Sequence, residues 1–357
     1  MKLQGPWSDL HDDFLDEITK WLSAIDYLMF GCVCRSWRSY VEKYKKNFMK
    51  SQPPLIVFLS EDVERACYFY SIFNRRLYRA ILPSLIGKSC SGITCGYLVL
   101  VDNEPREDSQ FWLLNPFTRH ELRFPCPANF IGRVILASLA MPLREFVLIA
   151  FCRYGPCLQY CRSTDTIWTI CDSRGRLTGE PVPWIVDGAV FKGKIYVLTG
   201  YGEIGVLNLN PHPYVTMLKV KGIGQQFYCS WQLIRCNEQL IMMRETSYGK
   251  YQVYELNFLK MEWVKMQNFG DQALFFSNSK GSGFFNPTRW IGSQQPCNCI
   301  YCVECIRGQY ILRFLDGRHP MSFPMMPTIM QGNHLSDASP FETHRYFPHV
   351  LQCGSSL

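Results

Sequence analysis

Four cysteines near the C-terminal end form the densest group of potential metal ligands in the sequence. They are Cys297, Cys299, Cys302 and Cys305. Four thiolates can hold zinc tetrahedrally, but a zinc knuckle pairs two CxxC units across a longer loop, which this spacing does not provide. In an extended strand Cys297 and Cys299 share one face and Cys302 lies on the other, so a single site would require the strand to break. We therefore expect strand cysteines and no metal site.

A glycine-rich string is the second candidate for chemistry. Residues 200–205, GYGEIG, match the dinucleotide-binding fingerprint, which works only where a strand turns into a helix whose N-terminus meets the pyrophosphate. Residues 206–209 read as a strand, so a hairpin is expected instead. The seven histidines lie in no motif that also supplies a nucleophile and an orienting acid, and no GxSxG, HExxH or P-loop string occurs. The sequence therefore indicates neither a catalytic site nor a cofactor.

The composition is typical of a globular protein with reduced thiols. The chain has 357 residues, of which 47% are hydrophobic and 19% charged, so it can bury a sizeable core. Its 17 cysteines are an odd number, and the N-terminus lacks the apolar core of a signal peptide. The longest apolar stretch, 131–151, is interrupted by Arg133, Arg144 and Glu145. We expect no membrane span, and a location in the nucleus, the cytoplasm or both.

The charge pattern does not favour nucleic acid as a partner. The formal net charge is +7, and the basic residues are scattered except for a run over 35–50. A solvated helix face followed by a linker explains that run better than a nucleic-acid contact.

Three short helices are predicted within the first forty-five residues. From Leu10, apolar residues recur at steps of three and four, with Asp9 as the expected cap. Ser23 opens a second helix in a pattern similar to a capping box, and Ser36 is the expected cap of a third. Such a unit is too small to bury all of its apolar faces, so an exposed docking surface is expected.

Particular residues of this segment carry a family resemblance. Residues 7–10, WSDL, and 33–39, VCRSWRS, make the segment similar to an F-box, which implies three helices that bind the Skp-type adaptor of an SCF (Skp-cullin-F-box) ubiquitin ligase. Carried over by position, with Leu15 and Leu22 added from the apolar helix face, the expected adaptor-binding residues are Leu10, Phe14, Leu15, Ile18, Leu22, Leu28, Val33, Cys34 and Trp37.

Two positions depart from the F-box pattern. His11 stands where a proline usually follows the first leucine, and Gly31 stands where a larger or charged residue is common. We expect them to weaken adaptor affinity without altering the fold. A vestigial F-box, or a helical cap that only packs on the rest of the protein, is the alternative.

Beyond Pro53-Pro54 the chain changes to short β runs separated by Gly, Asn, Asp and Pro. A strand, a turn and a second strand recur, and the large residue that marks the second strand returns at about 46 to 49 residues. These anchors are Leu122, Trp168, Tyr214 and Trp263. The period favours a β-propeller of about six blades over a sandwich or a pair of barrels.

The β region also carries a resemblance. Residues 96–102, GYLVLVD, 113–118, LLNPFT, and 122–125, LRFP, make most of 55–347 similar to the C-terminal domain of a large group of plant F-box proteins. Members of that group resemble kelch-type propellers and are generally treated as target-binding domains.

The combined interpretation is a mainly β protein with a small N-terminal α domain. We assign 5–48 to the F-box, 49–54 to a linker and 55–350 to the propeller. The resemblance implies a non-catalytic substrate receptor of an SCF ubiquitin ligase, with a Skp-type adaptor, through it a cullin, and an unknown protein target as partners. We expect no membrane or nucleic-acid partner. The alternatives are an inhibitory or sequestering protein with a vestigial F-box and a propeller hydrolase or lyase.

Overall fold

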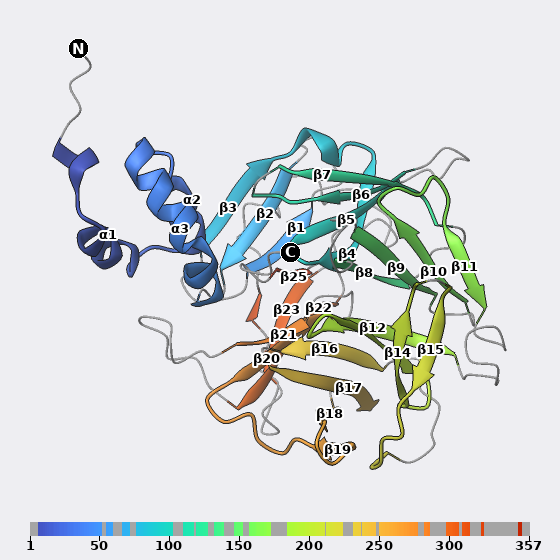
Figure 1. Ribbon diagram of the computed structural model, residues 1–357. Helices are drawn as coiled ribbons and strands as arrows, with labels where there is room; N and C mark the ends of the chain where they lie inside the picture. The colour runs from blue at the N-terminus through green and yellow to red at the C-terminus, as the bar shows by residue number, and fades with distance from the viewer. Residues whose placement is uncertain are drawn as a thin grey trace, which may run out of the picture.

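The computed structural model shows a helical N-terminal part beside a ring of β-sheets (Figure 1). The described residues are 6–51, 55–59, 66–71, 76–102, 110–117, 119–127, 132–138, 146–152, 157–172, 184–210, 212–223, 231–236, 238–247, 250–277, 282–285, 298–306, 309–314, 323–324 and 349–351.

The three predicted N-terminal helices are confirmed. A 3₁₀ turn, η1 (Pro6–Asp9), precedes α1 (Asp12–Thr19), α2 (Ala24–Phe30) and α3 (Arg35–Ser51). The last three residues of α3 fall in the segment 49–54 that the sequence assigned to a linker, so the helix extends further towards the first strand than expected. No helix in the described part of the chain is both long and apolar enough to span a membrane.

The helix starts differ from the prediction at two of three positions. His11, not Asp9, is the N-cap of α1, and its Nδ1 accepts a hydrogen bond from the Asp13 amide at 3.4 Å. Ser23 caps α2 as predicted, accepting from the Asp26 amide at 3.2 Å. Helix α3 begins at Arg35, so Ser36 lies inside the first turn. An imidazole can replace the usual Asp or Ser because the free N–H groups require only an acceptor.

Five sheets of the described chain contain four antiparallel strands each. The first is formed by β1 (Leu55–Leu59), β2 (Ala66–Ser71), β3 (Arg76–Ile81) and β25 (His349–Leu351). After η2 (Pro83–Leu85), the second is formed by β4 (Lys88–Thr94), β5 (Tyr97–Asp102), β6 (Gln110–Leu114) and β7 (Glu121–Pro125). The third is formed by β8 (Gly132–Ser138), β9 (Phe146–Cys152), β10 (Cys157–Arg162) and β11 (Thr169–Asp172).

The next two sheets repeat this arrangement, and the last one departs from it. The fourth is formed by β12 (Ile185–Phe191), β13 (Lys194–Thr199), β14 (Ile204–Asn208) and β15 (Tyr214–Met217). The fifth is formed by β16 (Gln232–Cys236), β17 (Gln239–Ser247), β18 (Lys250–Asn257) and β19 (Glu262–Lys265). The sixth has five strands: β20 (Ala273–Ser277), β21 (Ser282–Phe285), β22 (Cys299–Ile306), β23 (Gln309–Phe314) and β24 (Phe323–Pro324). Within it, β20 pairs in parallel with β22.

The sheets form a closed ring. Strand β4 contacts β8, β8 contacts β12, β12 contacts β16, β16 contacts β21, and β25 contacts both β4 and β20. The C-terminal β25 pairs with β1, with Leu351 opposite Leu55, so the two ends of the β domain meet in one sheet. The mainly β propeller class with a small α domain is thereby confirmed, and the sandwich and barrel alternatives are wrong. Closure suits four-stranded sheets, because neither face of such a sheet is covered by its own strands.

The predicted repeat matches the third and fourth strands of consecutive sheets. Leu122 lies in β7, Trp168 directly precedes β11, Tyr214 begins β15 and Trp263 lies in β19. Asn and Asp side chains hold the preceding turns: the Phe117 amide donates to Asn115 Oδ1 at 3.0 Å, and the Leu259 amide donates to Asn257 Oδ1 at 3.0 Å. These are Asx turns, in which the side chain replaces a backbone acceptor.

The glycine string and the cysteines lie in strands and turns. Gly200 and Gly202 belong to the hairpin between β13 and β14, which confirms the expected hairpin. Gly202 has a φ of +80°, a conformation that favours glycine. Cys299, Cys302 and Cys305 lie in β22, and Cys297 lies outside the described residues. Burial raises the pKa of the Cys161 and Cys171 thiols to about 11, which keeps them protonated and unreactive at neutral pH.

A buried ion pair joins the innermost strands of three consecutive sheets. Arg133 Nη1 of β8 donates to Asp187 Oδ2 of β12 at 2.7 Å, and the Leu233 amide of β16 donates to the same oxygen at 2.7 Å. Arg133 Nη1 also donates to the Leu233 carbonyl at 3.2 Å. Burial raises the pKa of Asp187, while the Arg133 charge and the Leu233 and Gly188 amides lower it. One carboxylate therefore holds three sheets in register around the ring.

Replacing Asp187 with Ala is expected to lower the free energy of unfolding by about 3–5 kcal/mol, because Arg133 and the Leu233 amide would lose their partner. The exposed pair of Lys192 and Glu238, 3.2 Å apart, offers a matched control, since Glu238→Ala should cost less than about 1 kcal/mol. Urea denaturation of both variants measures the difference. Equal losses of unfolding free energy in the two variants would show that the buried pair stabilises the fold no more than the exposed pair does.

Candidate protein-binding surface on the helical domain

Helix α1 and the turn that follows it present their side chains in two stripes, about 100° apart around the helix axis. Leu15 is 1% exposed, and Thr19 and Leu22 also turn inward, towards a core shared with α2 and α3. Phe14, Ile18 and Trp21 point away from that core and are 62%, 37% and 74% exposed. We call these three residues the outer stripe. The division follows from helix geometry, because residues three and four positions apart lie on one face.

The end of α2 and the segment that joins it to α3 add further exposed apolar side chains. Met29 and Val33 are exposed, and Cys34 is half-buried. Trp37 stacks on Phe30 with ring centroids 4.1 Å apart, and its indole N–H donates to the Trp7 carbonyl at 2.9 Å. Trp37 thus ties η1 to α3 and fixes the N-terminal end of the surface.

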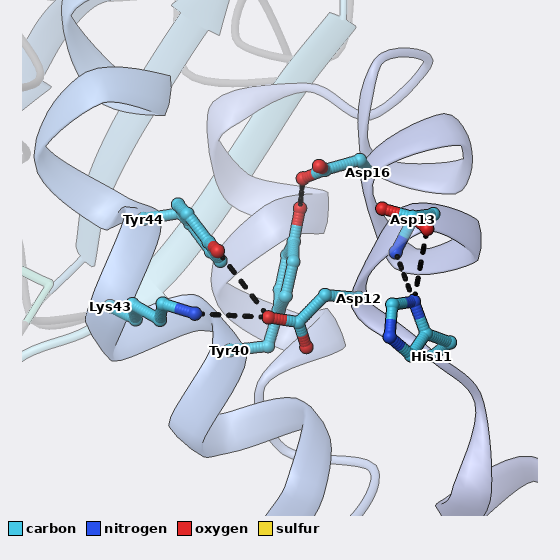
Figure 2. A network of polar contacts seen from close by, with 7 residues as sticks. All are labelled: His11, Asp12, Asp13, Asp16, Tyr40, Lys43 and Tyr44. Atoms are coloured by element: carbon cyan, nitrogen blue, oxygen red, sulfur yellow. Dashed lines mark hydrogen bonds and ion pairs between the residues drawn. The ribbon is translucent and has the colours of Figure 1, made fainter.

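A polar network holds α1 against α3 (Figure 2). The Tyr40 hydroxyl donates to Asp16 Oδ1 and lies 3.3 Å from Thr19 Oγ1. Closer to the start of α1, Asp12 accepts from Lys43 at 3.1 Å and from the Tyr44 hydroxyl at 3.3 Å. Carboxylates from α1 therefore meet hydroxyl and ammonium donors from α3, which fixes the rotation of α1 and with it the direction of the outer stripe.

Two tyrosines of the helical domain resist ionisation: Tyr40 of this network, and Tyr27, whose hydroxyl donates to the Val41 carbonyl at 3.5 Å. Burial, followed by the negative charge of Asp16, raises the pKa of Tyr27 to about 12. Burial and the hydrogen bond to Asp16 also raise the pKa of Tyr40. Both hydroxyls therefore keep their protons at physiological pH and can donate, Tyr40 to Asp16 and Tyr27 to the Val41 carbonyl.

The helical domain lies beside the first sheet (Figure 1), and its apolar core is continuous with that of the first two sheets. One continuous apolar core contains residues of the helices and strand residues such as Val57, Phe69 and Leu100. Tyr27 stacks on Phe48 with centroids 3.7 Å apart, and the Ser23 hydroxyl lies 3.2 Å from the Tyr78 hydroxyl of β3. The side of the trio that faces the ring is covered, whereas the outer stripe is not.

The sequence-predicted contact residues fall into three groups. Phe14, Ile18 and Val33 are exposed, and Leu15 is buried, so Leu15 stabilises the trio and presents no surface to a partner. The half-buried residues are Leu10, Leu22, Leu28, Cys34 and Trp37. Sequence reasoning missed three exposed residues, Trp7, Trp21 and Met29. The spacing of three residues between Ile18 and Trp21 was the sequence signal that could have placed Trp21 on the same face as Ile18.

The two departures from the family pattern are accommodated locally. His11 caps α1, and Gly31 is buried where α2 approaches α3. A Cβ at Gly31 would lie 3.3 Å from Val41 Cβ and 3.4 Å from the Leu28 carbonyl oxygen, so a larger residue would require Val41 to shift by a few tenths of an ångström. Neither residue disturbs the three-helix arrangement.

Within the described ranges, no group of three or more His, Cys, Asp or Glu residues is placed to hold a metal ion.

Comparison with known proteins assigns both parts of the chain. Residues 7–49 match the F-box domain family, and residues 69–326 match the KIB1-4 beta-propeller family. The chain is 23% identical over 258 residues to the F-box protein At1g10110 of Arabidopsis thaliana, covering 58% of this chain and 59% of that relative, which is less than two thirds of its length. The putative F-box protein At4g17565 of the same plant is 22% identical over 306 residues, covering 75% and 77%.

Solved structures give only a distant likeness. TolB from Acinetobacter baumannii has a TM-score of 0.43 at 11% identity, covering 81% of this chain and 70% of TolB. A likeness at this level carries no functional argument.

Replacing Tyr40 with Phe is expected to lower the free energy of unfolding by about 1–2 kcal/mol, because Asp16 and Thr19 lose a hydrogen-bond partner. Lys43→Ala is the control: its ion pair with Asp12 is exposed and should contribute less than about 1 kcal/mol. Denaturation followed by far-UV circular dichroism compares them. A larger loss in the Lys43 variant would contradict this ranking.

Alkaline pH is expected to destabilise the helical domain. In the unfolded chain Tyr27 ionises near its ordinary pKa of 10.0, while in the fold it keeps its proton to about 12. Stability present below pH 10 therefore declines as pH rises towards the folded pKa. Denaturation midpoints between about pH 9 and about pH 11.5 should fall less steeply in Tyr27→Phe than in the wild type. Parallel slopes would rule Tyr27 out as a source of the decline.

Proposed function

Because this chain belongs to the F-box proteins whose second domain is a KIB1-4 β-propeller, we propose that it acts as the substrate receptor of an SCF-type ubiquitin ligase. In this proposal the helical domain binds a Skp-type adaptor, the adaptor connects it to a cullin, and the propeller holds the protein target. F-box and propeller domains are typical of non-catalytic receptors.

The observation that carries the proposal is the exposed apolar surface of the helical domain. The outer stripe, together with Met29 and Val33, places large apolar side chains in solvent. A chain rarely keeps such a surface unless a partner covers it. The hydrophobic adaptor contact expected for an F-box supplies that partner.

The proposed receptor contributes proximity and no bond chemistry of its own. The adaptor and cullin bring an activated ubiquitin near the propeller, and the bound target then presents a lysine at high effective concentration. This requires a fixed path from adaptor to target. The core shared by the helices and the first two sheets supports such a path.

Target contact is assigned to connections of the propeller that carry exposed aromatic side chains, because aromatic residues are enriched among strong contacts. Trp184, just before β12, and Tyr201, in the β13–β14 hairpin, are both partly exposed. The Gly200 amide donates to the Trp184 carbonyl at 2.9 Å, which brings the two connections together. A receptor of this kind would work in the nucleus, the cytoplasm or both, where thiols stay reduced.

Adaptor binding tests the proposal directly. A Phe14→Asp, Val33→Asp double variant places two carboxylates in the apolar contact and should weaken binding to a purified Skp-type adaptor by at least about a hundredfold, because burying an unpaired charge is costly. Leu259→Asp is the matched control, since Leu259 is 98% exposed on a turn of the fifth sheet and lies outside the helical domain. Calorimetric titration measures all three proteins.

The wild type should bind the adaptor at submicromolar concentration and support cullin-dependent ubiquitin transfer to a co-purified target. Failure to bind the adaptor at all would overturn the proposal. Adaptor binding without ubiquitin transfer would instead support a sequestering protein with a vestigial F-box.

A further inference from the structure

We propose that Trp21 is a principal contact for the Skp-type adaptor and extends the adaptor surface beyond the end of α1. The inference rests on the proposed function and adds a residue that the family pattern did not identify. The adaptor is the proposed partner of this side chain.

Trp21 is exposed to an unusual degree for a tryptophan. Among the described large apolar side chains, only Leu259 has a larger exposed fraction. An indole combines a large apolar area with one N–H donor, so leaving it in water forgoes a large burial free energy. Exposed tryptophans of this kind are enriched among the residues that dominate protein interfaces.

The backbone places Trp21 directly in line with the outer stripe. Helix α1 ends at Thr19, and the chain continues as a 3₁₀-type turn in which the Trp21 amide donates to the Ile18 carbonyl at 3.2 Å. In that geometry side chains three residues apart eclipse one another. Trp21 therefore lies over Ile18, which follows Phe14 by one helical turn, and the three form a continuous apolar strip.

The same turn holds Trp21 in place. The Leu22 amide donates to the Thr19 carbonyl at 3.1 Å, and the Leu22 side chain packs on the core of the helical domain. Trp21 thus lies between the anchored Leu22 and the end of α1. Its backbone is already ordered, so binding would cost little backbone entropy. A preordered anchor loses less entropy on association, which favours affinity.

Charged residues border the strip. Glu17 of α1 and the C-cap residue Lys20 form an exposed ion pair beside the outer stripe. Asp13 lies on the same helix and is also exposed. An apolar centre surrounded by a polar rim is the usual anatomy of a protein interface, so the contact expected at Phe14 and Ile18 extends to Trp21.

Two substitutions test the proposal against the adaptor. Trp21→Ala should weaken adaptor binding at least about tenfold, and Trp21→Phe should retain much of the affinity because the ring still fills the contact. The control is Leu259→Ala, which removes an exposed apolar side chain from a turn of the fifth sheet, far from any proposed contact, and should leave adaptor affinity unchanged. Thermal unfolding of each variant should match the wild type, since Trp21 lies outside the core.

A spectroscopic measurement reports burial independently of affinity. The protein labelled with 5-fluorotryptophan gives a ¹⁹F resonance that Trp21→Phe assigns by its disappearance. Adding the adaptor should shift that resonance and reduce its sensitivity to the solvent isotope. An unchanged resonance in the saturated complex would overturn the inference.

The outcomes separate this inference from the proposed function. If Phe14→Asp, Val33→Asp abolishes adaptor binding while Trp21→Ala leaves it intact, the receptor function stands and Trp21 is not a contact. If the wild type fails to bind the adaptor, both fall together. If Trp21→Ala only abolishes self-association in sedimentation, a second copy is the partner and the inference is wrong.

Discussion

Three short helices cannot bury all of their apolar side chains among themselves, and the organisation of this protein follows from that constraint. On one side the trio shares a continuous core with the first two sheets, through residues such as Tyr27, Val57 and Phe69. On the other side nothing in the described chain covers the outer stripe. The first side fixes the helices to the propeller, and the second leaves an exposed apolar surface.

The orientation of the outer stripe depends on polar contacts as much as on apolar packing. Leu15 and Thr19 turn inward, but the rotation of α1 about its axis is set where Asp16 and Asp12 meet the tyrosines and the lysine of α3. Apolar packing is tolerant of small rotations, whereas a hydrogen bond has a direction. The polar network therefore specifies which apolar residues face solvent.

Ring closure provides the rigid body to which the helices are attached. The C-terminal strand β25 pairs with β1, the first strand of the β domain. The sheet that contacts the helices is therefore also the one that closes the ring. On the innermost strands, Asp187 connects three sheets through Arg133 and the Leu233 amide. In the proposed receptor function this stiffness would raise the effective concentration of the target, because a flexible joint would lower it.

The sequence by itself determined the three helices, the change to β structure, the turn-and-anchor repeat and the family resemblance, because periodicity and turn chemistry are local properties. It also placed Phe14, Ile18 and Val33 among the expected adaptor-binding residues, and these three side chains are exposed. It misplaced the cap at Asp9, assigned the last three residues of α3 to a linker and counted the buried Leu15 as adaptor-binding, while omitting the exposed Trp21. Those points were decided by tertiary structure: which stripe of α1 faces inward depends on α3, a helix whose position the local pattern does not contain.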